Sequence, residues 1–209
     1  MVGKPRVTVV VDSSCCLPIN LQKDSGIVIV PHRLIVNGRA YRDGIDMHAD
    51  EFYRLQKIET TKTTTSGPTI KDFQDVFQRA CESGKDVLCL TLPSKFSSAT
   101  TDAASIAMQT VKQQFPTLRI QIIDSQASAG AEGLIALETA RSAIRGAELE
   151  ELIHITNQMI PKVHLIAFLD TLTYLKRSGR ITKAKAWAGS ILGIKPLAEL
   201  SLGNARLIS

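Results

Sequence analysis

Two runs of apolar residues limit this chain to a small set of folds. Residues 6–11 are almost entirely β-branched, and residues 87–92 form an apolar run of the same length. Neither run alternates regularly with polar residues, which is typical of strands that are covered on both faces. Helix-forming segments follow, so the sequence predicts an α/β fold with a mainly parallel sheet and helices on both of its faces.

The other segments predict a chain in which strands and helices alternate. Further strands are expected at residues 27–30, 118–123, 163–169 and 194–200, with a hairpin at 33–41 that turns at Asn37-Gly38. Helices are expected at residues 17–21, 51–58, 70–80, 103–111, 128–145, 148–160, 171–177 and 184–192. Asp50 is expected to cap the second helix, and Thr69 or Ser66 the third. Residues 59–69 are rich in hydroxyl side chains and predict a polar link, while Gly203-Asn204 predicts a turn.

Composition and charge are those of an ordinary soluble protein. Of the 209 residues, 44% are hydrophobic and only 5% are aromatic, so the core must be aliphatic. The sequence contains neither an apolar run of membrane-spanning length nor a signal peptide, so we expect a cytoplasmic protein with no transmembrane segment. The formal charge of +5 is scattered and no nucleic-acid-binding motif accompanies it, so no nucleic acid partner is expected. Four cysteines are expected to be reduced structural thiols: Cys15, Cys16, Cys81 and Cys89.

Hydroxyl and acidic side chains gather where the predicted strands end. They lie at Asp12-Ser13-Ser14, at residues 93–101 and at Asp124-Ser125, and a further corner at residues 65–68 opens a helix. The carboxyl ends of parallel strands share one edge of a sheet, where ligands bind. The turn at 93–101 precedes a helix whose first amides have no internal partner and favour an anion. The alternative is that Ser97 or Ser98 only caps this helix.

The same residues offer little support for catalysis. The sequence contains no P-loop, no dinucleotide fingerprint and no Gly-x-Ser-x-Gly elbow. A hydrolase or transferase that used Ser97 as a nucleophile would need a positioned base. The candidate bases are histidines, which are more often structural or on the surface than catalytic: His32, His48, His154 and His164. Asp12 and Asp124 could together bind a metal, but aspartates at strand ends more often cap the next turn. We therefore expect a binding protein without catalytic residues, metal or cofactor.

A set of short motifs resembles the DegV family. In order, they are Val11-Asp12-Ser13-Ser14, Thr65-Ser66-Gly67-Pro68, Ser94-Lys95-Phe96-Ser97, Ile123-Asp124-Ser125, Thr171-Leu172-x-Tyr174-Leu175 with Gly179-Arg180-Ile181, and Ile194-Lys195-Pro196-Leu197. Their order and spacing cover essentially the whole chain and are more specific than any one of them. Two departures concern the turn after Ser97, where Ser98-Ala99 replaces the Gly-Thr of the family, and the segment after Asp124, where Ala129 and Ala131 replace a Ser and a Gly.

The resemblance implies a bacterial carrier that binds a long-chain fatty acid and presents its carboxylate to a fatty acid kinase, as a step in phospholipid metabolism. It implies that Thr65 and Ser97 bind the carboxylate and that Arg180 faces the partner or the phosphate. Supporting positions would be Ser66, Ser98, Ser13, Asp124 and Ser125. It also implies two α/β domains, with carboxylate-binding loops in residues 1–160 and the start of a shortened second domain in residues 161–209.

The physical chemistry of a fatty acid fits such a site. An acyl tail of roughly fifteen methylenes could gain about 12 kcal/mol on full burial. Each hydrogen bond to the carboxylate would add about 1.5–3 kcal/mol. The tail should therefore supply most of the affinity and the hydroxyl groups the orientation. Residues 127–137 and 165–169 are candidate walls of the tail site, and the alternative is that they are ordinary core.

Overall fold

The structure is a computed structural model that describes residues 5–58, 60–171, 174 and 197–208. Arg180, the expected helix at 184–192 and most of the one at 171–177 lie outside the described residues.

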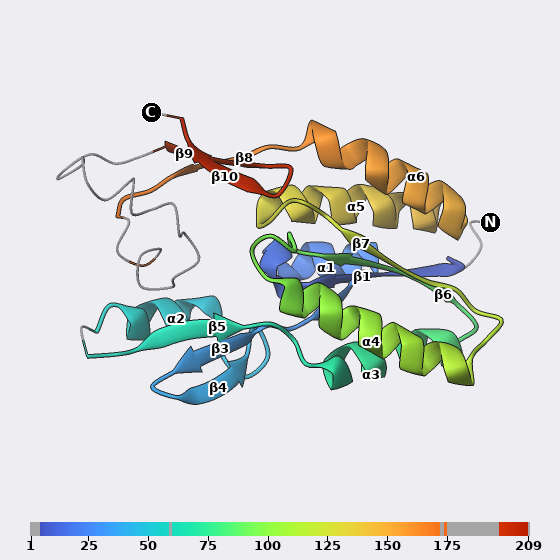
Figure 1. The fold of residues 1–209 in the computed structure, drawn as a ribbon, viewed down its shortest axis with the longest axis horizontal. Helices are drawn as coiled ribbons and strands as arrows, with labels where there is room; N and C mark the ends of the chain where they lie inside the picture. The colour runs from blue at the N-terminus through green and yellow to red at the C-terminus, as the bar shows by residue number, and fades with distance from the viewer. Residues whose placement is uncertain (1–4, 59, 172–173, 175–196, 209) are drawn as a thin grey trace.

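A four-stranded parallel sheet forms the centre of the described chain (Figure 1). Its strands are β1 (Val7–Asp12), β2 (Val28–Val30), β6 (Asp86–Thr91) and β7 (Ile120–Asp124), in the order β2-β1-β6-β7. All three pairings are parallel. The predicted parallel sheet is thus confirmed, and the ends of β1, β6 and β7 share one edge.

Helices cover both faces of this sheet (Figure 1). One face packs against α5 (Gly130–Ile144) and α6 (Leu149–Met159), together with α1 (Ile19–Ser25). The other face packs against α3 (Ile70–Glu82) and α4 (Ser98–Gln114). Thr69 caps α3 through a capping box with Asp72. It is one of the two residues expected to cap this helix.

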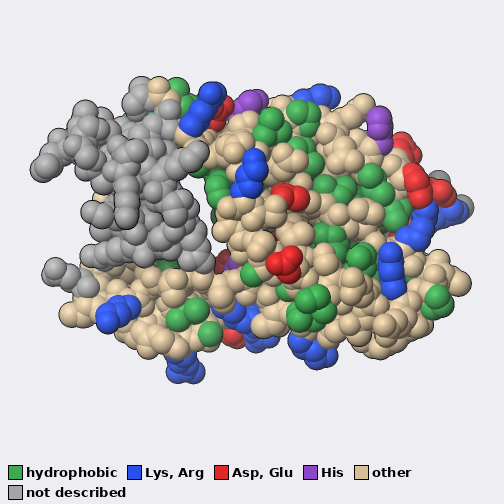
Figure 2. Space-filling model, viewed as in Figure 1, with side chains coloured by type: hydrophobic (Ala, Val, Ile, Leu, Met, Phe, Trp, Pro, Cys, Tyr) green, Lys and Arg blue, Asp and Glu red, His purple; other side chains and the backbone are tan. Residues whose placement is uncertain are grey.

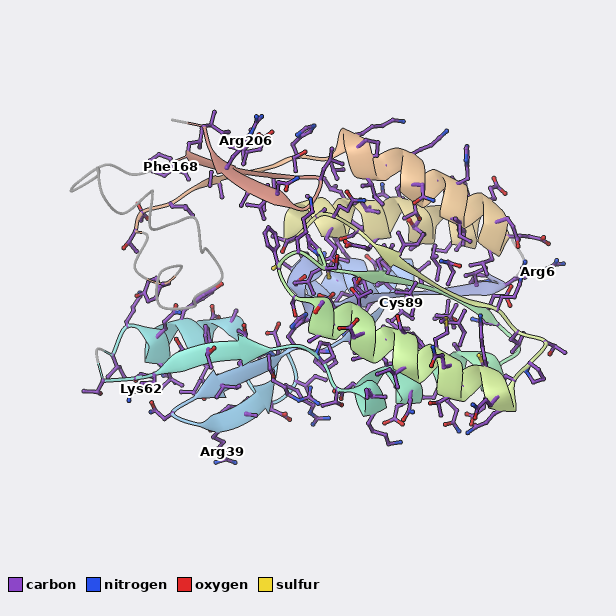
Figure 3. All side chains as sticks on the ribbon, in the orientation of Figure 1. Arg6, Arg39, Lys62, Cys89, Phe168 and Arg206 are labelled. Atoms are coloured by element: carbon purple, nitrogen blue, oxygen red, sulfur yellow. The ribbon has the colours of Figure 1, made fainter. Side chains whose placement is uncertain are left out.

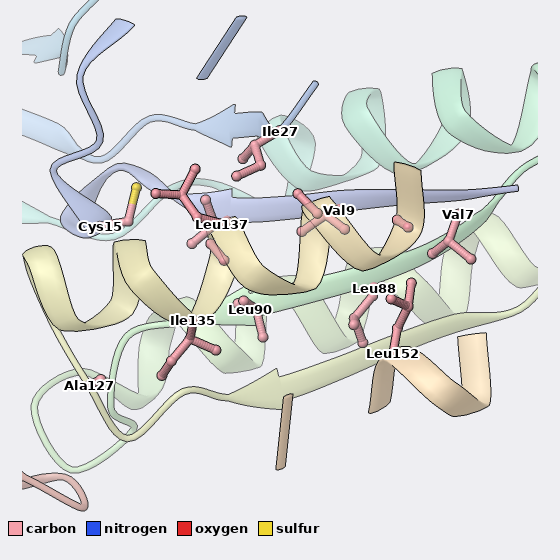
Figure 4. Packing of buried hydrophobic residues seen from close by; sticks show 14 of the residues in the cluster. Val7, Val9, Cys15, Ile27, Leu88, Leu90, Ala127, Ile135, Leu137 and Leu152 are labelled. Carbon is pink, nitrogen blue, oxygen red and sulfur yellow. The ribbon is translucent and has the colours of Figure 1, made fainter. Parts of the chain in front are cut away.

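Alternation along the central strands divides the core into two clusters. Val9, Leu88 and Leu90 pack beneath α5 and α6 with Ile135 and Leu152, as Figure 4 shows. Their neighbours on the same strands turn to the opposite face and pack against α3 and α4: Val10, Val87 and Cys89. Because successive side chains of a strand point to opposite faces, both halves of an unbroken apolar run are buried.

A second, antiparallel sheet has the order β4-β3-β5 and lies beside α2 (Ala49–Gln56) (Figure 1). It comprises β3 (Arg33–Val36), β4 (Arg39–Arg42) and β5 (Thr63–Ser66). The predicted polar link at 59–69 is therefore wrong in part, because four of its residues pair with the free edge of β3. Threonine is β-branched and favours strands, although its hydroxyl group makes the segment resemble a polar loop. The expected cap at Asp50 is also wrong, since α2 begins at Ala49 and Asp50 lies in its first turn.

A third sheet, also antiparallel, has the order β10-β9-β8. Its strands are β8 (Leu165–Phe168), β9 (Leu197–Ser201) and β10 (Asn204–Leu207). The β9–β10 turn is made by Leu202 and Gly203, one residue earlier than expected, and Asn204 already belongs to β10. Short 3-10 helices follow β1 (η1, Ser13–Cys15) and α6 (η2, Ile160–Lys162).

The distribution of basic side chains and the character of the helices agree with what the sequence predicts. On the face drawn in Figure 2, Lys and Arg side chains are scattered rather than gathered into one basic patch. Among the helices of the described residues, none combines the length and apolar character that crossing a membrane requires.

Candidate functional site

Asp12, at the end of β1, joins two of the loops at the carboxyl edge of the central sheet. Its buried carboxylate accepts hydrogen bonds from the Leu92 amide at 2.8 Å and the Ser14 amide at 2.9 Å. The Leu92 amide contacts Oδ2, while Nε2 of His32 lies 3.0 Å from Oδ1, the oxygen that also accepts from Ser14. Burial opposes ionisation of Asp12, but the hydrogen bonds from His32, Leu92 and Ser14 outweigh it and lower the pKa of Asp12. Asp12 therefore anchors the loops as a carboxylate.

Asp124, at the end of β7, has the same role on the other side of β6. Its Oδ2 accepts from the Ser94 amide at 3.0 Å and from Ser94 Oγ at 2.7 Å, while Oδ1 accepts from the Gln126 amide at 2.8 Å. Both strand-end aspartates thus cap turns, as the sequence suggested. Within the part of the chain that the structure describes, no group of three or more His, Cys, Asp or Glu side chains could hold a metal ion.

Ser13 and His32 link the central sheet to the end of β5. Ser13 Oγ donates to Asp43 Oδ2 at 2.7 Å and accepts from the His32 amide at 3.1 Å. Nδ1 of the His32 ring lies 3.2 Å from the Ser66 carbonyl oxygen. Of these residues, Asp43 carried no sequence signal, and His32 was considered only as a base. Their contacts fix the strand that carries Thr65 against the loop after β1.

Ser125 lies beneath this edge in a buried polar cluster with Ser14 and Glu132. Ser14 Oγ donates to Glu132 Oε2 at 2.7 Å, and Ser125 Oγ lies 3.4 Å from Oε1. Glu132 is fully buried, and burial, followed by the nearby charge of Asp12, raises its pKa well above the usual range. No sequence signal marks Glu132, because an acid in the first turn of a helix is ordinarily exposed. Ser125 is therefore part of the support beneath the site rather than of its surface.

Thr65 lies on β5 and Ser97 precedes α4, and the segments that follow these two residues meet. A Cβ built on Gly67 would lie only 2.9 Å from Thr100 Oγ1, so the segment after β5 touches the first turn of α4. Thr65 is exposed on β5, opposite Leu34 of β3. Ser97 occupies the N-cap position of α4 and is half-buried, yet its side chain makes no capping hydrogen bond. Capping therefore does not explain Ser97, and its hydroxyl is available at the start of a helix.

A groove of about 440 Å³ lies near the loop after β1, between α5 and β8. Its lining includes Leu17, Gly130, Leu134, Leu165 and Ile166. The two candidate wall segments thus line one groove, but not with all their residues. Ala127 and Ile135 are ordinary core, whereas Leu134 and Ile166 are 58% and 59% exposed. Phe168, which lies on β8 with Ile166 and is labelled in Figure 3, is 65% exposed.

A match to a family of known proteins spans almost the entire chain. The family model is described as uncharacterised proteins of the DegV family, and it matches residues 6–208. The chain belongs to the DegV family. A DegV domain-containing protein of Caldanaerobacter subterraneus is 34% identical over 203 residues, which cover 97% of this chain and 70% of that protein.

Solved DegV-type structures share the fold. A structure described as a stearic acid-binding protein from Eubacterium ventriosum has a TM-score of 0.90 and 28% identity, with 97% of this chain and 70% of that chain covered. A DegV family protein from Thermus thermophilus, described by its fatty acid binding, has a TM-score of 0.84 and 30% identity, with coverage of 98% and 71%. These likenesses confirm the predicted DegV-like α/β fold.

In this DegV protein the described histidines do not support a serine nucleophile. The ring of His32 contacts Asp12 and the Ser66 carbonyl, His154 contacts Gln158, and His164 contacts Glu199. Among the described residues, no histidine ring has a hydrogen bond with Ser97. A general base must lie within hydrogen-bond reach of the proton that it removes, so the geometry gives the hydrolase or transferase alternative no support.

Proposed function

We propose that this chain binds one long-chain fatty acid, whose carboxylate accepts hydrogen bonds from Thr65 and Ser97. The observation that carries the proposal is the contact of Gly67 with Thr100, which brings the two hydroxyl-bearing loops together at the start of α4. A helix start favours an anion, and the Ser97 hydroxyl is not used for capping. Ser66 and Ser98 are exposed beside these residues and would support them, while Ser13, Asp124 and Ser125 hold the loops.

The tail would lie in the groove between α5 and β8, against Leu134 and Ile166. Burial of apolar side chains that are otherwise exposed adds to the gain from burying the methylenes themselves. On this proposal residues 1–160 supply the carboxylate-binding loops, and residues 161–209 supply part of the tail site. Support also comes from the DegV-family structures that are described as fatty acid-binding proteins.

The binding proposal predicts separate effects of the two hydroxyl groups. Thr65→Val and Ser97→Ala should each raise the Kd for oleate roughly tenfold, because each removes one hydrogen bond to a charged group. Titration calorimetry measures this Kd, and native mass spectrometry of the wild-type chain should show a co-purified fatty acid. Thr64→Val is the matched control, since Thr64 is also exposed but points to the opposite face of β5. A wild-type chain without any exchangeable lipid would contradict the proposal.

We further propose that the chain is a cytoplasmic carrier and not an enzyme, and that it presents the bound carboxylate to a fatty acid kinase. Arg180 would contact that partner or the transferred phosphate. Incubation of the oleate-loaded chain with ATP should yield acyl phosphate only when such a kinase is added, and Arg180→Ala should lower this rate roughly tenfold without changing the Kd for oleate. Product formed by the chain alone would contradict the carrier role.

A further inference from the structure

The tip of the β9–β10 hairpin contacts the loops that follow β6 and β7. The Gly203 amide donates to the Gln126 carbonyl oxygen at 2.7 Å, and Lys95 Nζ donates to Asn204 Oδ1 at 3.1 Å. A Cβ built on Gly203 would lie 3.5 Å from both Pro93 Cβ and Lys95 Cδ. The hairpin tip, residues 202–204, is therefore packed directly on residues 93–95, two residues before Ser97.

The hairpin tip has a demanding backbone conformation. Leu202 and Gly203 have φ angles of 49° and 67°, as in the two-residue turns that match the twist of a hairpin. A left-handed conformation is unfavourable for a non-glycine residue such as Leu202. Asn204 Nδ2 donates to the Leu202 carbonyl oxygen at 3.0 Å and so supports the turn from within. The side-chain amide of Asn204 thus stabilises the turn through its nitrogen and binds Lys95 through its oxygen.

The contacted loop leads without a break to the proposed carboxylate site. Asp124 accepts hydrogen bonds from the amide and the hydroxyl of Ser94, which belongs to this loop. It also accepts from the amide of Gln126, whose carbonyl oxygen the hairpin tip contacts. The Ser97 amide donates to the Pro93 carbonyl oxygen at 3.2 Å, so the position of Ser97 depends on that of Pro93. The tip therefore acts on the same short turn that orients the Ser97 side chain.

We propose that the hairpin tip is a latch that holds residues 93–97 in the conformation that binds the carboxylate. Asn204 and Lys95 are then positioning residues, which act on the ligand through Ser97. This proposal rests on the proposed carboxylate site, and it makes the third sheet part of that site's support. A binding loop that is already ordered by contacts with another part of the chain loses less conformational freedom when the ligand binds, and this raises affinity.

The test compares hairpin variants in oleate binding and in amide hydrogen exchange of residues 94–98, since Pro93 has no amide hydrogen. Asn204→Ala should raise the Kd for oleate about fivefold, as expected for the loss of one hydrogen bond, and should speed exchange in this segment of the ligand-free chain. Lys95→Met retains the aliphatic stem and should give the same two effects. The double variant should be no worse than Asn204→Ala alone, because Lys95→Met removes a contact that Asn204→Ala has already removed. Asn204→Asp retains the oxygen that Lys95 binds and should restore most of the affinity.

Arg206→Ala is the matched control, because Arg206 lies on the same hairpin (Figure 3) but binds Glu199 instead of residues 93–95. It should leave both readouts unchanged. The latch is overturned if the amide hydrogens of residues 94–98 exchange at the wild-type rate in Asn204→Ala and Lys95→Met, or if the effects of the two substitutions on the Kd add fully. The exchange experiment needs no ligand, so it still decides the latch if the wild-type chain fails to bind oleate, a result that would refute the proposed function instead.

Discussion

Replacing Gly133 with alanine is expected to lower the free energy of unfolding by about 2–3 kcal/mol. A Cβ at this position would lie 2.8 Å from the Cys15 carbonyl oxygen and 3.0 Å from Leu17 Cδ2. The first of these neighbours is backbone, so relief requires α5 to move away from the segment that follows β1. That movement would separate Ala131 and Ile135 from the buried cluster beneath α5. Equilibrium unfolding in urea, followed by circular dichroism, measures the loss.

Gly130→Ala is the matched control for this substitution. Gly130 begins the same helix three residues earlier, and a Cβ built there meets nothing within 4 Å. Alanine also has a higher helix propensity than glycine, so this variant should be as stable as the wild-type chain or slightly more stable. Equal losses in the two variants would contradict the prediction, because they would show that the close approach of Gly133 to Cys15 does not decide the effect.

Replacing Glu132 with glutamine is expected to make the chain more stable at neutral pH and to flatten the pH dependence of its stability. Burial, followed by the nearby charge of Asp12, raises the pKa of Glu132 well above 4.5, so the folded chain favours the neutral acid at pH values where an exposed glutamate is ionised. The stability that comes from the raised pKa is complete below pH 4.5 and is lost as pH rises towards the folded-state pKa. In that window each pH unit costs the wild-type chain about 1.4 kcal/mol relative to the glutamine variant.

The measurement is urea unfolding of both chains at several pH values from below 3.8 upward. Glutamine can keep the contacts with Ser14 and Ser125 because its amide has the shape of the neutral acid. Glu132→Leu should instead be less stable than the glutamine variant at every pH, since it leaves the Ser14 hydroxyl without its acceptor. Asp12 has a lowered pKa and contributes stability that is lost only as pH falls below 3.8, so both chains should share that acid limb. Parallel curves for the wild-type and glutamine chains above pH 4.5 would refute the neutral Glu132.

The sequence by itself predicted the features that depend on the local pattern of residues. Unbroken apolar runs predicted the central strands, and helix-forming segments between them predicted a parallel sheet that is covered on both faces. Turn and cap residues with strong local preferences, Asn37-Gly38 and Thr69, were also placed correctly. The ordered motifs identified the family over essentially the whole chain, and they drew attention to the loops that bear Thr65 and Ser97.

Tertiary structure alone decided the features that depend on pairing across the chain. Residues 63–66 form a strand only because β3 offers a free edge, and the pKa of Glu132 is raised only because α5 buries this side chain near Asp12. The contacts of Gly67 with Thr100, and of the hairpin tip with residues 93–95, join segments more than thirty and more than one hundred residues apart. Local sequence determines which conformations a segment prefers, but the partner of a backbone edge or a buried charge is determined only when distant segments are packed together.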